Sequence, residues 1–359
     1  MKYTYFTCGP SQLYPGVFRH LQIAFDKDIP SLSHRSKIFQ QIYKSTQDNL
    51  RKLLSIPKSH KIFFVSSSLE SMEKIIQNCV EKNSFHFVNG AFSRKFYQFA
   101  EILKKQPIKY EVPEGEGYLP EKVMIPPDTE LICVMQNETS TGVAIPVQSI
   151  NRLYTQNPKS LIAVDIVSSA PYVELNFNKI DLTFFSVQKG FGLPAGMGVL
   201  IINEEALAKA QFLRKKGINV GSYHSFSSLL EKDQIFQTPE TPNVLLIYLL
   251  GQVCKDILKK GMNMIREETE AKAKLVYDFF DKHPRCKPFV KNSNYRSKTT
   301  IAIDVMGDTN KIVKKLKSKG IVVSSGYGKF KESHIRIANF PAHSAKDFTN
   351  LVRYLNIIS

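Results

Sequence analysis

Residues 184–196 read FFSVQKGFGLPAG, and this stretch decides the fold class because it sets one lysine between two buried-strand patterns. An apolar run over residues 181–187 precedes Lys189, and a second run over residues 197–202 follows a turn rich in glycine and proline. A strand end is rigid, and the turn after it leaves a side chain accessible. We therefore expect Lys189 to be a reactive group at the edge of a sheet.

A carboxylate ends another buried-strand pattern further upstream. Residues 161–169 read LIAVDIVSS, so that Asp165 directly follows four apolar residues. A lysine can form a Schiff base with an aldehyde, and an aspartate can hold a protonated pyridine nitrogen; pyridoxal phosphate chemistry requires this pair. Lys189 and Asp165 together therefore predict pyridoxal 5'-phosphate as the cofactor. We expect no metal site, because the cysteines show no metal-like pairing.

Short apolar runs alternate with helical patterns between about residues 60 and 240. Strands are expected at residues 61–65, 85–88, 108–112, 131–135, 161–166, 182–187 and 198–202. Helical patterns lie between several of them, at residues 69–81, 93–105 and 147–155. This alternation predicts an α/β fold in which helices cover a mostly parallel, seven-stranded sheet.

The length of 359 residues predicts two domains, because one ordinary core does not grow to this size. We expect an N-terminal segment over residues 1–15, a large cofactor-binding domain over 16–243, and a connecting helix with a smaller α/β domain over 244–359. The connecting helix is expected to run from Val244 to about His283. Beyond it, strands are expected at residues 299–305, 321–324 and 334–338, and helices at 309–319 and 345–356.

Composition predicts a soluble cytoplasmic enzyme. Hydrophobic residues make up 43% and charged residues 23% of the chain. No apolar segment typical of a signal peptide follows Lys2, and the longest apolar run, residues 244–250, is far shorter than the roughly 20 residues of a membrane span. Five dispersed cysteines suit reduced thiols. We expect no membrane partner.

The net charge of +17 permits two interpretations. A large positive field attracts nucleic acids, and it also gathers small anionic substrates. The lysines are spread along the chain, and no recognised nucleic-acid motif accompanies them. We therefore expect small anionic amino acids and keto acids as partners, and no nucleic acid.

Three further strand ends carry residues suited to a ligand. Residues 66–69 follow a strand and open a helix, where backbone N–H groups can bind phosphate. Simple capping of this helix by Ser67 and Glu70 is the alternative. Phe92 follows another strand, where it can stack on a flat ring or belong to the core. Thr139 follows a third strand, and ligands of open parallel sheets collect at this edge.

The order of these motifs resembles the class V, fold-type I, pyridoxal-phosphate-dependent aminotransferases. The resemblance covers nearly the whole chain and includes Asn-Glu-Thr at residues 137–139, Gln-Lys-Gly at 188–190 and Thr-Pro at 238–239. Within that class the chain is most similar to the phosphoserine aminotransferases. Residues 33–39 read SHRSKIF, in the place of that family's early Ser-His-Arg segment, and residues 6–11 read FTCGPS, like its opening Gly-Pro turn.

The resemblance implies roles for the residues around the cofactor. Lys189 would hold the cofactor as a Schiff base and then move the substrate proton, while Asp165 would keep the pyridine nitrogen protonated. Phe92 would stack on the ring in place of the family's tryptophan, and Thr139 would hydrogen-bond the cofactor's edge.

The resemblance also implies how the cofactor phosphate and the substrate are held. Ser68, the Leu69 N–H and Gln188 would bind the phosphate, with Gln237 and Thr238 from the second subunit of a homodimer with shared active sites. The implied substrate residues are Arg336 for the α-carboxylate, Cys8 at the same site, and His34 and Arg35 for the distal anion.

The implied activity is transamination between O-phosphoserine and 2-oxoglutarate in serine biosynthesis. Two departures leave the substrate open: Leu69 stands where this family usually has an arginine, and only Lys329 and Lys331 stand where it often has a His-Arg pair. A serine– or alanine–glyoxylate aminotransferase of the same class is the first alternative.

A cysteine desulfurase and a non-enzymatic binding protein are less favoured. A cysteine desulfurase needs an exposed cysteine loop in the C-terminal third, whereas Cys286 is expected at the end of a helix. A basic binding protein that kept the fold without its chemistry has no need of Lys189 and Asp165 at two strand ends.

Overall fold

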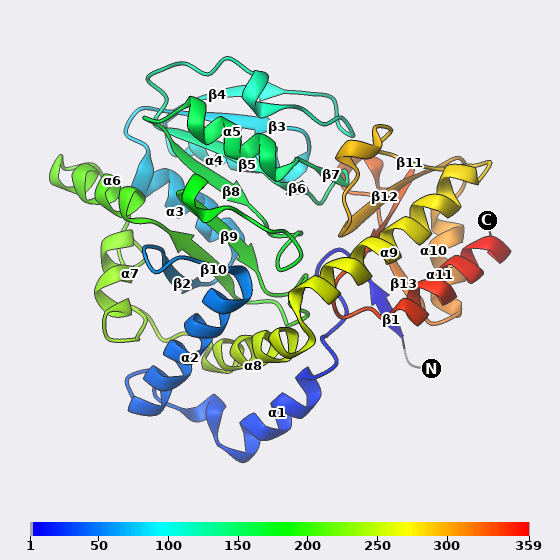
Figure 1. Cartoon of the computed structure of the whole chain (residues 1–359), viewed down its shortest axis with the longest axis horizontal. Coiled ribbons are helices and arrows are strands. Elements are labelled where there is room, and N and C mark those ends of the chain that lie inside the picture. The colour runs from blue at the N-terminus through cyan, green and yellow to red at the C-terminus, as the bar shows by residue number, and fades with distance from the viewer. Residues whose placement is uncertain (1–2, 359) are drawn as a thin grey trace.

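The computed structural model describes residues 3–358 and divides into two parts of unequal size. The larger part contains a seven-stranded sheet, and the smaller part, which carries the C-terminus, contains a five-stranded sheet (Figure 1). The site described below lies where these two parts meet.

The large sheet contains every strand that the sequence predicts between residues 60 and 203. Its strands are β2 (Lys61–Val65), β3 (Asn83–Val88), β4 (Gln106–Glu111), β5 (Leu131–Met135), β8 (Leu161–Asp165), β9 (Leu182–Ser186) and β10 (Gly198–Ile202). Their order is β2-β10-β9-β8-β5-β3-β4, and all neighbours are parallel except β10, which runs antiparallel to both β2 and β9. The prediction of a mostly parallel seven-stranded sheet is therefore confirmed.

Helices cover both faces of this sheet, because successive strand residues point to opposite sides. Phe64 and Phe185 face a core shared with residues of α2 (Lys37–Leu54) and α8 (Val244–Lys260). Their neighbours Phe63 and Phe184 face a second core, shared with other helices of this part. The remaining helices of the larger part are α1 (Val17–Asp26), α3 (Ser68–Cys79), α4 (Ala91–Ile102), α5 (Val147–Gln156), α6 (Glu204–Lys215) and α7 (Phe226–Asp233).

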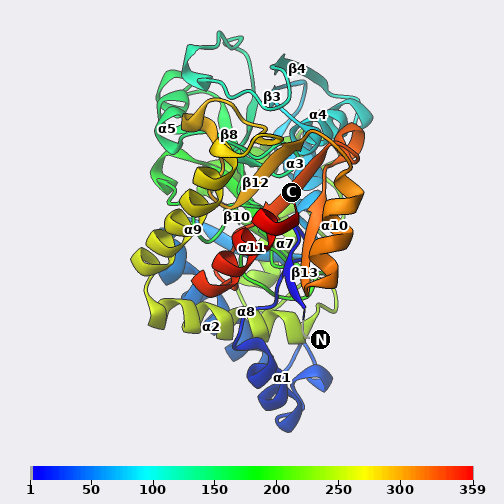
Figure 2. The same cartoon turned by 90° about the vertical axis from the view of Figure 1, so that its right-hand side faces the viewer.

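The small sheet combines both ends of the chain. Its strands are β1 (Thr4–Phe6), β11 (Cys286–Pro288), β12 (Thr300–Val305), β13 (Ile321–Ser325) and β14 (His334–Ala338), in the order β1-β13-β14-β12-β11. The unexpected strand β1 pairs in parallel with β13, beside which it lies in Figure 2. Cys286 lies in β11, antiparallel to β12, so the expectation that it ends a helix is wrong. The helices α10 (Thr309–Ser318) and α11 (Ala345–Ile358) flank this sheet.

The connection between the two parts is two helices, where the sequence predicts one. The helix α8 ends at Lys260, and α9 (Met262–Lys282) begins two residues later. Gly261 between them has φ +89°, a conformation that glycine adopts without the steric cost of a side chain. The apolar pattern continues through this break because α8 packs against α2 and α9 packs against α11.

A short two-stranded sheet lies between the large sheet and the small one. It pairs β6 (Asn137–Glu138) with β7 (Val143–Ala144), directly after β5. This hairpin places Thr139 at the boundary between the two parts of the molecule.

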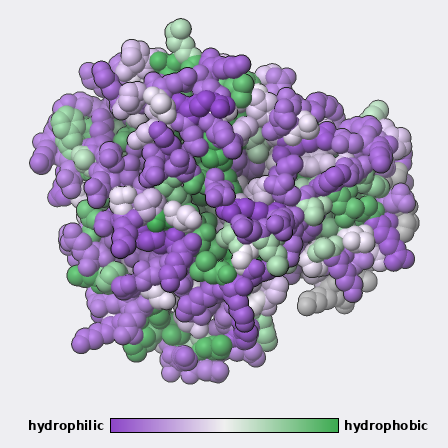
Figure 3. Space-filling model, viewed as in Figure 1, coloured by the Kyte–Doolittle hydropathy of each residue, from purple (hydrophilic) through white to green (hydrophobic). Residues whose placement is uncertain are grey.

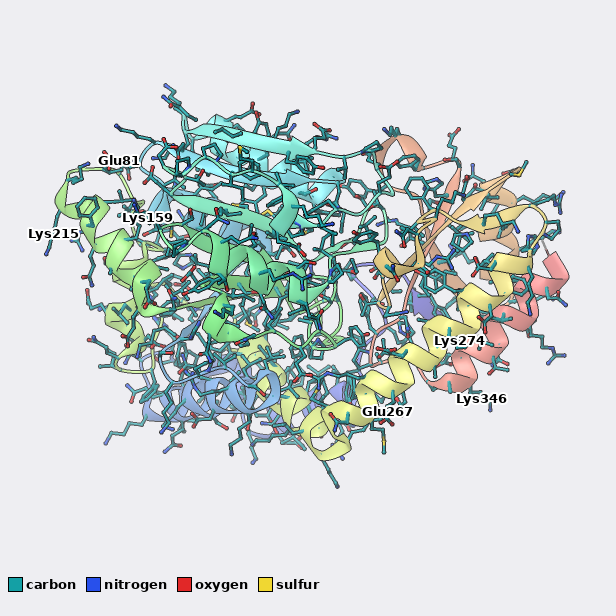
Figure 4. The ribbon with its side chains drawn as sticks, turned by 45° about the horizontal axis from the view of Figure 1, so that its top comes forward. Glu81, Lys159, Lys215, Glu267, Lys274 and Lys346 are labelled. Carbon is teal, nitrogen blue, oxygen red and sulfur yellow. The ribbon has the colours of Figure 1, made fainter. Side chains whose placement is uncertain are left out.

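The surface is mainly hydrophilic, and its positive charge is spread over several elements. Figure 3 shows polar residues over most of the face that it presents. Lys215 on α6, Lys274 on α9 and Lys346 on α11 point outward from separate helices in Figure 4. Among the helices built from residues 3–358, none combines the length and the apolar character that crossing a membrane requires.

Candidate active site

A cavity of about 270 Å³ opens at the carboxyl ends of the central strands, against the small sheet. Parallel strands bring their carboxyl ends to one edge, which explains why motifs far apart in the sequence meet there. Nine of the predicted site residues line the cavity: Cys8, Ser68, Leu69, Phe92, Thr139, Asp165, Gln188, Lys189 and Arg336.

Lys189 is buried at the centre of this cavity. Its Nζ donates a hydrogen bond to Thr139 Oγ1 at 2.9 Å and lies 5.3 Å from the centre of the Phe92 ring. Burial lowers the pKa of Lys189, because the cation loses hydration, although the charge of Asp165 opposes this shift. A lowered pKa makes the free amine, which is the nucleophilic form, easier to reach at neutral pH.

The chain can approach Lys189 closely because of a glycine. Gly9 has φ +134°, and a Cβ atom there would lie 3.0 Å from Lys189 Cε. A side chain at this position would therefore be strained and would press on the lysine stem.

Asp165 is the last residue of β8 and is completely enclosed. Its Oδ1 accepts a hydrogen bond from the Val167 N–H at 2.8 Å. Burial raises the pKa of Asp165, against the opposing effects of the Val167 hydrogen bond and the charge of Lys189. A cation brought next to this carboxylate would favour its ionised form, and the carboxylate would in turn keep that cation protonated.

The turn of residues 66–69 links β2 to α3, and Ser67 in this turn caps the helix, as the sequence allowed. Ser67 Oγ accepts the Glu70 N–H at 3.1 Å, as expected for a cap. The Glu70 carboxylate reaches back to Ser66, whose N–H and Oγ donate to it at 2.7 and 2.6 Å. Within the described residues 3–358, the backbone N–H of Leu69 has no hydrogen-bond partner. Capping therefore leaves a donor free beside the cavity.

Phe92 is held by a carboxylate whose role the sequence did not reveal. The buried Glu138 accepts hydrogen bonds from the N–H groups of Phe92 and Ser93 at 3.2 and 2.9 Å. A Cβ atom at Gly90 would lie 2.4 Å from Glu138 Cγ, so the helix start and this side chain fit only with glycine there. The Asn-Glu-Thr motif was recognisable in the sequence, but only the fold shows that its glutamate anchors α4.

Arg336 forms the wall that the small sheet contributes. It lies on β14, and its Nη1 donates to the Thr139 carbonyl at 3.1 Å while its Nε donates to the Ser325 carbonyl at 3.0 Å. Cys8 is anchored nearby, because its N–H donates to Ser324 Oγ at 3.1 Å, and burial raises the pKa of its thiol.

Tyr327 is a cavity residue that the sequence did not predict. Its ring centre lies 5.1 Å from that of Phe92 and 5.5 Å from the guanidinium carbon of Arg336. It follows β13 in an irregular turn, and no motif in the sequence marks it.

Four predicted site residues lie outside the cavity of the same chain, and together they form what we call the outer cluster: His34, Arg35, Gln237 and Thr238. Arg35 Nη1 donates to Gln237 Oε1 at 2.7 Å and to the Thr238 carbonyl at 2.8 Å. The assignment of Gln237 and Thr238 to the site of a second subunit stays a prediction.

The model of the family described as Aminotransferase class-V matches residues 5–337. The chain belongs to this family. It is 27% identical over 360 residues to a phosphoserine aminotransferase from Rhodococcus opacus. This alignment covers 98% of this chain and 94% of that protein. A solved phosphoserine aminotransferase from Cytophaga hutchinsonii is 45% identical, with a TM-score of 0.97, over 99% of this chain and 98% of that one.

More distant structures share the fold of this class V aminotransferase. An aspartate aminotransferase from Thermus thermophilus superposes with a TM-score of 0.85 at 18% identity, over 99% of this chain and 98% of that one. The predicted fold type and the predicted enzyme class are therefore both confirmed.

Membership of this family implies pyridoxal phosphate, and the residues of the cavity fit that group. A buried lysine can meet its aldehyde, a buried carboxylate can meet its ring nitrogen, and the Leu69 N–H has no partner among the described residues. The buried amide oxygen of Gln188 also lacks a partner within residues 3–358. Polar groups left unpaired in a native structure indicate a polar ligand.

Proposed function

We propose that this aminotransferase exchanges an amino group between O-phosphoserine and 2-oxoglutarate, with pyridoxal phosphate as cofactor. The observation that carries this proposal is the 45% identity to a phosphoserine aminotransferase over 99% of the chain. The alternative is a glyoxylate-using aminotransferase of the same class, which Leu69 favours because it removes an expected guanidinium from the distal-anion site.

Lys189 and Asp165 would carry the chemistry. Bound pyridoxal phosphate supplies an aldehyde that condenses with amines and a ring that withdraws electrons from the substrate α-carbon. Lys189 holds the cofactor and then, as a free amine, moves a proton at the substrate α-carbon. Asp165 keeps the ring nitrogen protonated, which its enclosed carboxylate can do without competition from water.

The remaining cavity residues would orient the reactants. Ser68, the free Leu69 N–H and Gln188 hold the cofactor phosphate at the N-terminus of α3, where the helix dipole favours an anion. Phe92 covers the ring. Arg336 binds the substrate α-carboxylate with its guanidinium fork, and Cys8 borders the same position.

The outer cluster would complete the site of a second copy in a homodimer. Gln237 and Thr238 reach the partner's cofactor phosphate, and His34 and Arg35 meet the distal anion of the substrate. Large apolar side chains exposed on the first two helices support an interface: Phe18 and Phe25 on α1 are 71% and 63% exposed, and Ile38 on α2 is 53% exposed. Figure 3 shows hydrophobic surface at the lower end, where α1 lies. Sedimentation of a fully active monomer would contradict this assembly.

A cytoplasmic location completes the proposal. It is supported by the five cysteines, all of them buried free thiols in the structure.

Steady-state transamination with a panel of amino donors tests the substrate. We expect O-phosphoserine with 2-oxoglutarate to be used, and unphosphorylated serine to be a much poorer donor, because it lacks the distal anion. If alanine or serine with glyoxylate outperforms O-phosphoserine, the enzyme is the glyoxylate-using alternative.

Borohydride reduction tests the cofactor separately from the substrate. Reduction should bleach the yellow holoenzyme and attach the cofactor covalently to the peptide that contains Lys189. Recovery of the label on another lysine would contradict the central assignment.

A further inference from the structure

His224 bridges two carboxylates that belong to two different functional segments. Its Nδ1 makes a hydrogen bond to the Glu70 carboxylate, and its Nε2 lies 2.7 Å from a carboxylate oxygen of Glu240. The His224 side chain is only 3% exposed. Both ring nitrogens can donate at once only when the imidazole is protonated, so the two contacts together require the cation.

The surrounding charges favour that cation. Burial alone would lower the pKa of His224, but the hydrogen bonds to Glu240 and Glu70 outweigh it and raise the pKa to about 9. Burial alone would raise the pKa of Glu70, but hydrogen bonds from His224 and Ser66 lower it to about 2. The other titratable groups here are Tyr223, whose ring centre lies 4.1 Å from that of His224, and His34, which interacts with Glu240.

The first carboxylate reaches the turn of residues 66–69. Glu70 Oε2 accepts both the N–H and the hydroxyl of Ser66, and the Glu70 N–H is bound to Ser67 Oγ. Through Glu70, the turn is therefore tied to the ion pair with His224.

The second carboxylate belongs to the loop of residues 237–240, because Glu240 is the last residue of that loop. The Glu240 carbonyl accepts the Thr238 hydroxyl at 2.8 Å, and Arg35 holds the other side of the loop through Gln237 and the Thr238 carbonyl. Thr238 is buried by these contacts. The loop is thus clamped between Arg35 and the imidazolium of His224.

We infer that His224 is a positioning residue for the cofactor phosphate, because it fixes the 66–69 turn and the 237–240 loop relative to each other. The inference rests on the proposed function for the phosphate contacts of these two segments. Since the turn serves its own site and the loop serves the partner's site in the proposed dimer, one histidine would position phosphate ligands of both sites.

The test compares cofactor affinity in the apo forms of the native enzyme and of the His224→Gln variant. The dissociation constant for pyridoxal phosphate should rise by about 10- to 100-fold in the variant, which is one to two decades of affinity. The dissociation constant for pyridoxal, which lacks the phosphate, should hardly change. Equal losses for both ligands would overturn the inference, because His224 would then act on the site as a whole.

The pH profile gives a second readout that a purely structural role would not produce. The pKa of about 9 lies above the ordinary value of 6.5, so the clamp is complete below about pH 6.5 and is lost as the pH rises through about 9. The affinity ratio between native enzyme and variant should therefore fall toward one above pH 9. Using the ratio cancels the titration of Lys189 and of the cofactor, which both proteins share.

Two further variants keep the test decisive. His20→Gln is the matched control, because His20 is also buried and pairs with one carboxylate, Asp256, at 2.7 Å on a different helix; its cofactor affinity should stay native. Glu240→Gln removes only the loop carboxylate, and it replaces His224→Gln if that variant does not fold.

Native cofactor affinity in both His224→Gln and Glu240→Gln, with only a lower melting temperature, would overturn the inference. A native enzyme that binds no pyridoxal phosphate would instead refute the proposed function.

Discussion

The cavity and the outer cluster differ in how deeply their charged residues are buried and in which residues these contact. In the cavity, Lys189, Asp165 and Thr139 are buried and belong to one chain. Lys189 donates a hydrogen bond to Thr139, and its charge interacts with that of Asp165. In the outer cluster, Arg35 is exposed, and its guanidinium holds loop atoms of the same chain instead of facing the cavity. The residues of the proposed reaction centre therefore come from one chain, whereas the proposed distal-anion contacts require a second one.

Burial explains why these two regions should respond differently to substitution. In the cavity, desolvation shifts the pKa values of Lys189 and Asp165 toward each other, so removing either partner changes the charge state of the other. Charges of the outer cluster stay closer to solvent, where their interactions are weaker. We expect substitutions in the cavity to reduce kcat and substitutions in the outer cluster to raise KM.

The largest effect is expected for Lys189→Ala. The variant should lose at least about 10³-fold in kcat, because both the covalent anchor and the proton carrier are removed. Single-turnover and steady-state transamination measure this loss. Lys215→Ala, at an exposed lysine on α6, is the control and should be as active as the native enzyme. Substantial turnover in Lys189→Ala would move the reaction centre to another residue.

Asp165→Asn should lose about 10²- to 10³-fold in kcat, the usual cost of removing one preorganised electrostatic partner. The asparagine can still accept the Val167 N–H, so the fold and cofactor binding should persist. Absorbance titration of the cofactor together with kcat checks both expectations. Near-native turnover would show that another group holds the ring nitrogen, and Asp165 would then be an ordinary strand-end carboxylate.

Arg35→Ala tests whether the outer cluster serves the substrate. The KM for O-phosphoserine and for glutamate should rise by about 10- to 100-fold, since a lost charged hydrogen bond costs about 1.5–3 kcal/mol. Alanine, which has no distal anion, should be used as well as by the native enzyme. An equal rise in the KM for alanine would contradict the proposed difference between the cavity and the outer cluster. Arg35 would then act by holding the 237–240 loop and not by binding the distal anion.

The smallest effect is expected for Phe92→Leu. Loss of an aromatic contact of about 0.5–1.5 kcal/mol should raise the dissociation constant for pyridoxal phosphate by roughly 2- to 10-fold. The leucine keeps the residue apolar, and the Phe92 N–H can still bind Glu138. Equilibrium titration of the apoenzyme measures the change, and a loss above 100-fold would mean that the ring also supports the cavity wall.

The sequence alone determined the large sheet and pointed to the proposed reaction centre. Six of the seven strands are largely buried and appear as short apolar runs, so they were recognisable without their partners. The edge strand β4 is mostly exposed and was recognised from its β-branched and aromatic residues after a helical pattern. Lys189 and Asp165 were recognisable because a charged residue at the end of such a run has few purely structural explanations. The family resemblance then pointed to Arg336 and Cys8, which no periodicity would have singled out.

Only the tertiary structure decided how distant segments meet. A glycine inside a continuous apolar pattern does not reveal a helix break, so the end of α8 at Gly261 was missed. Strand β1 has no local partner, because it pairs with β13 more than 300 residues away. Glu70, His224 and Glu240 likewise carry no common pattern. Ion pairs and strand pairing depend on distance in space, and local residue preferences contain no information about that distance.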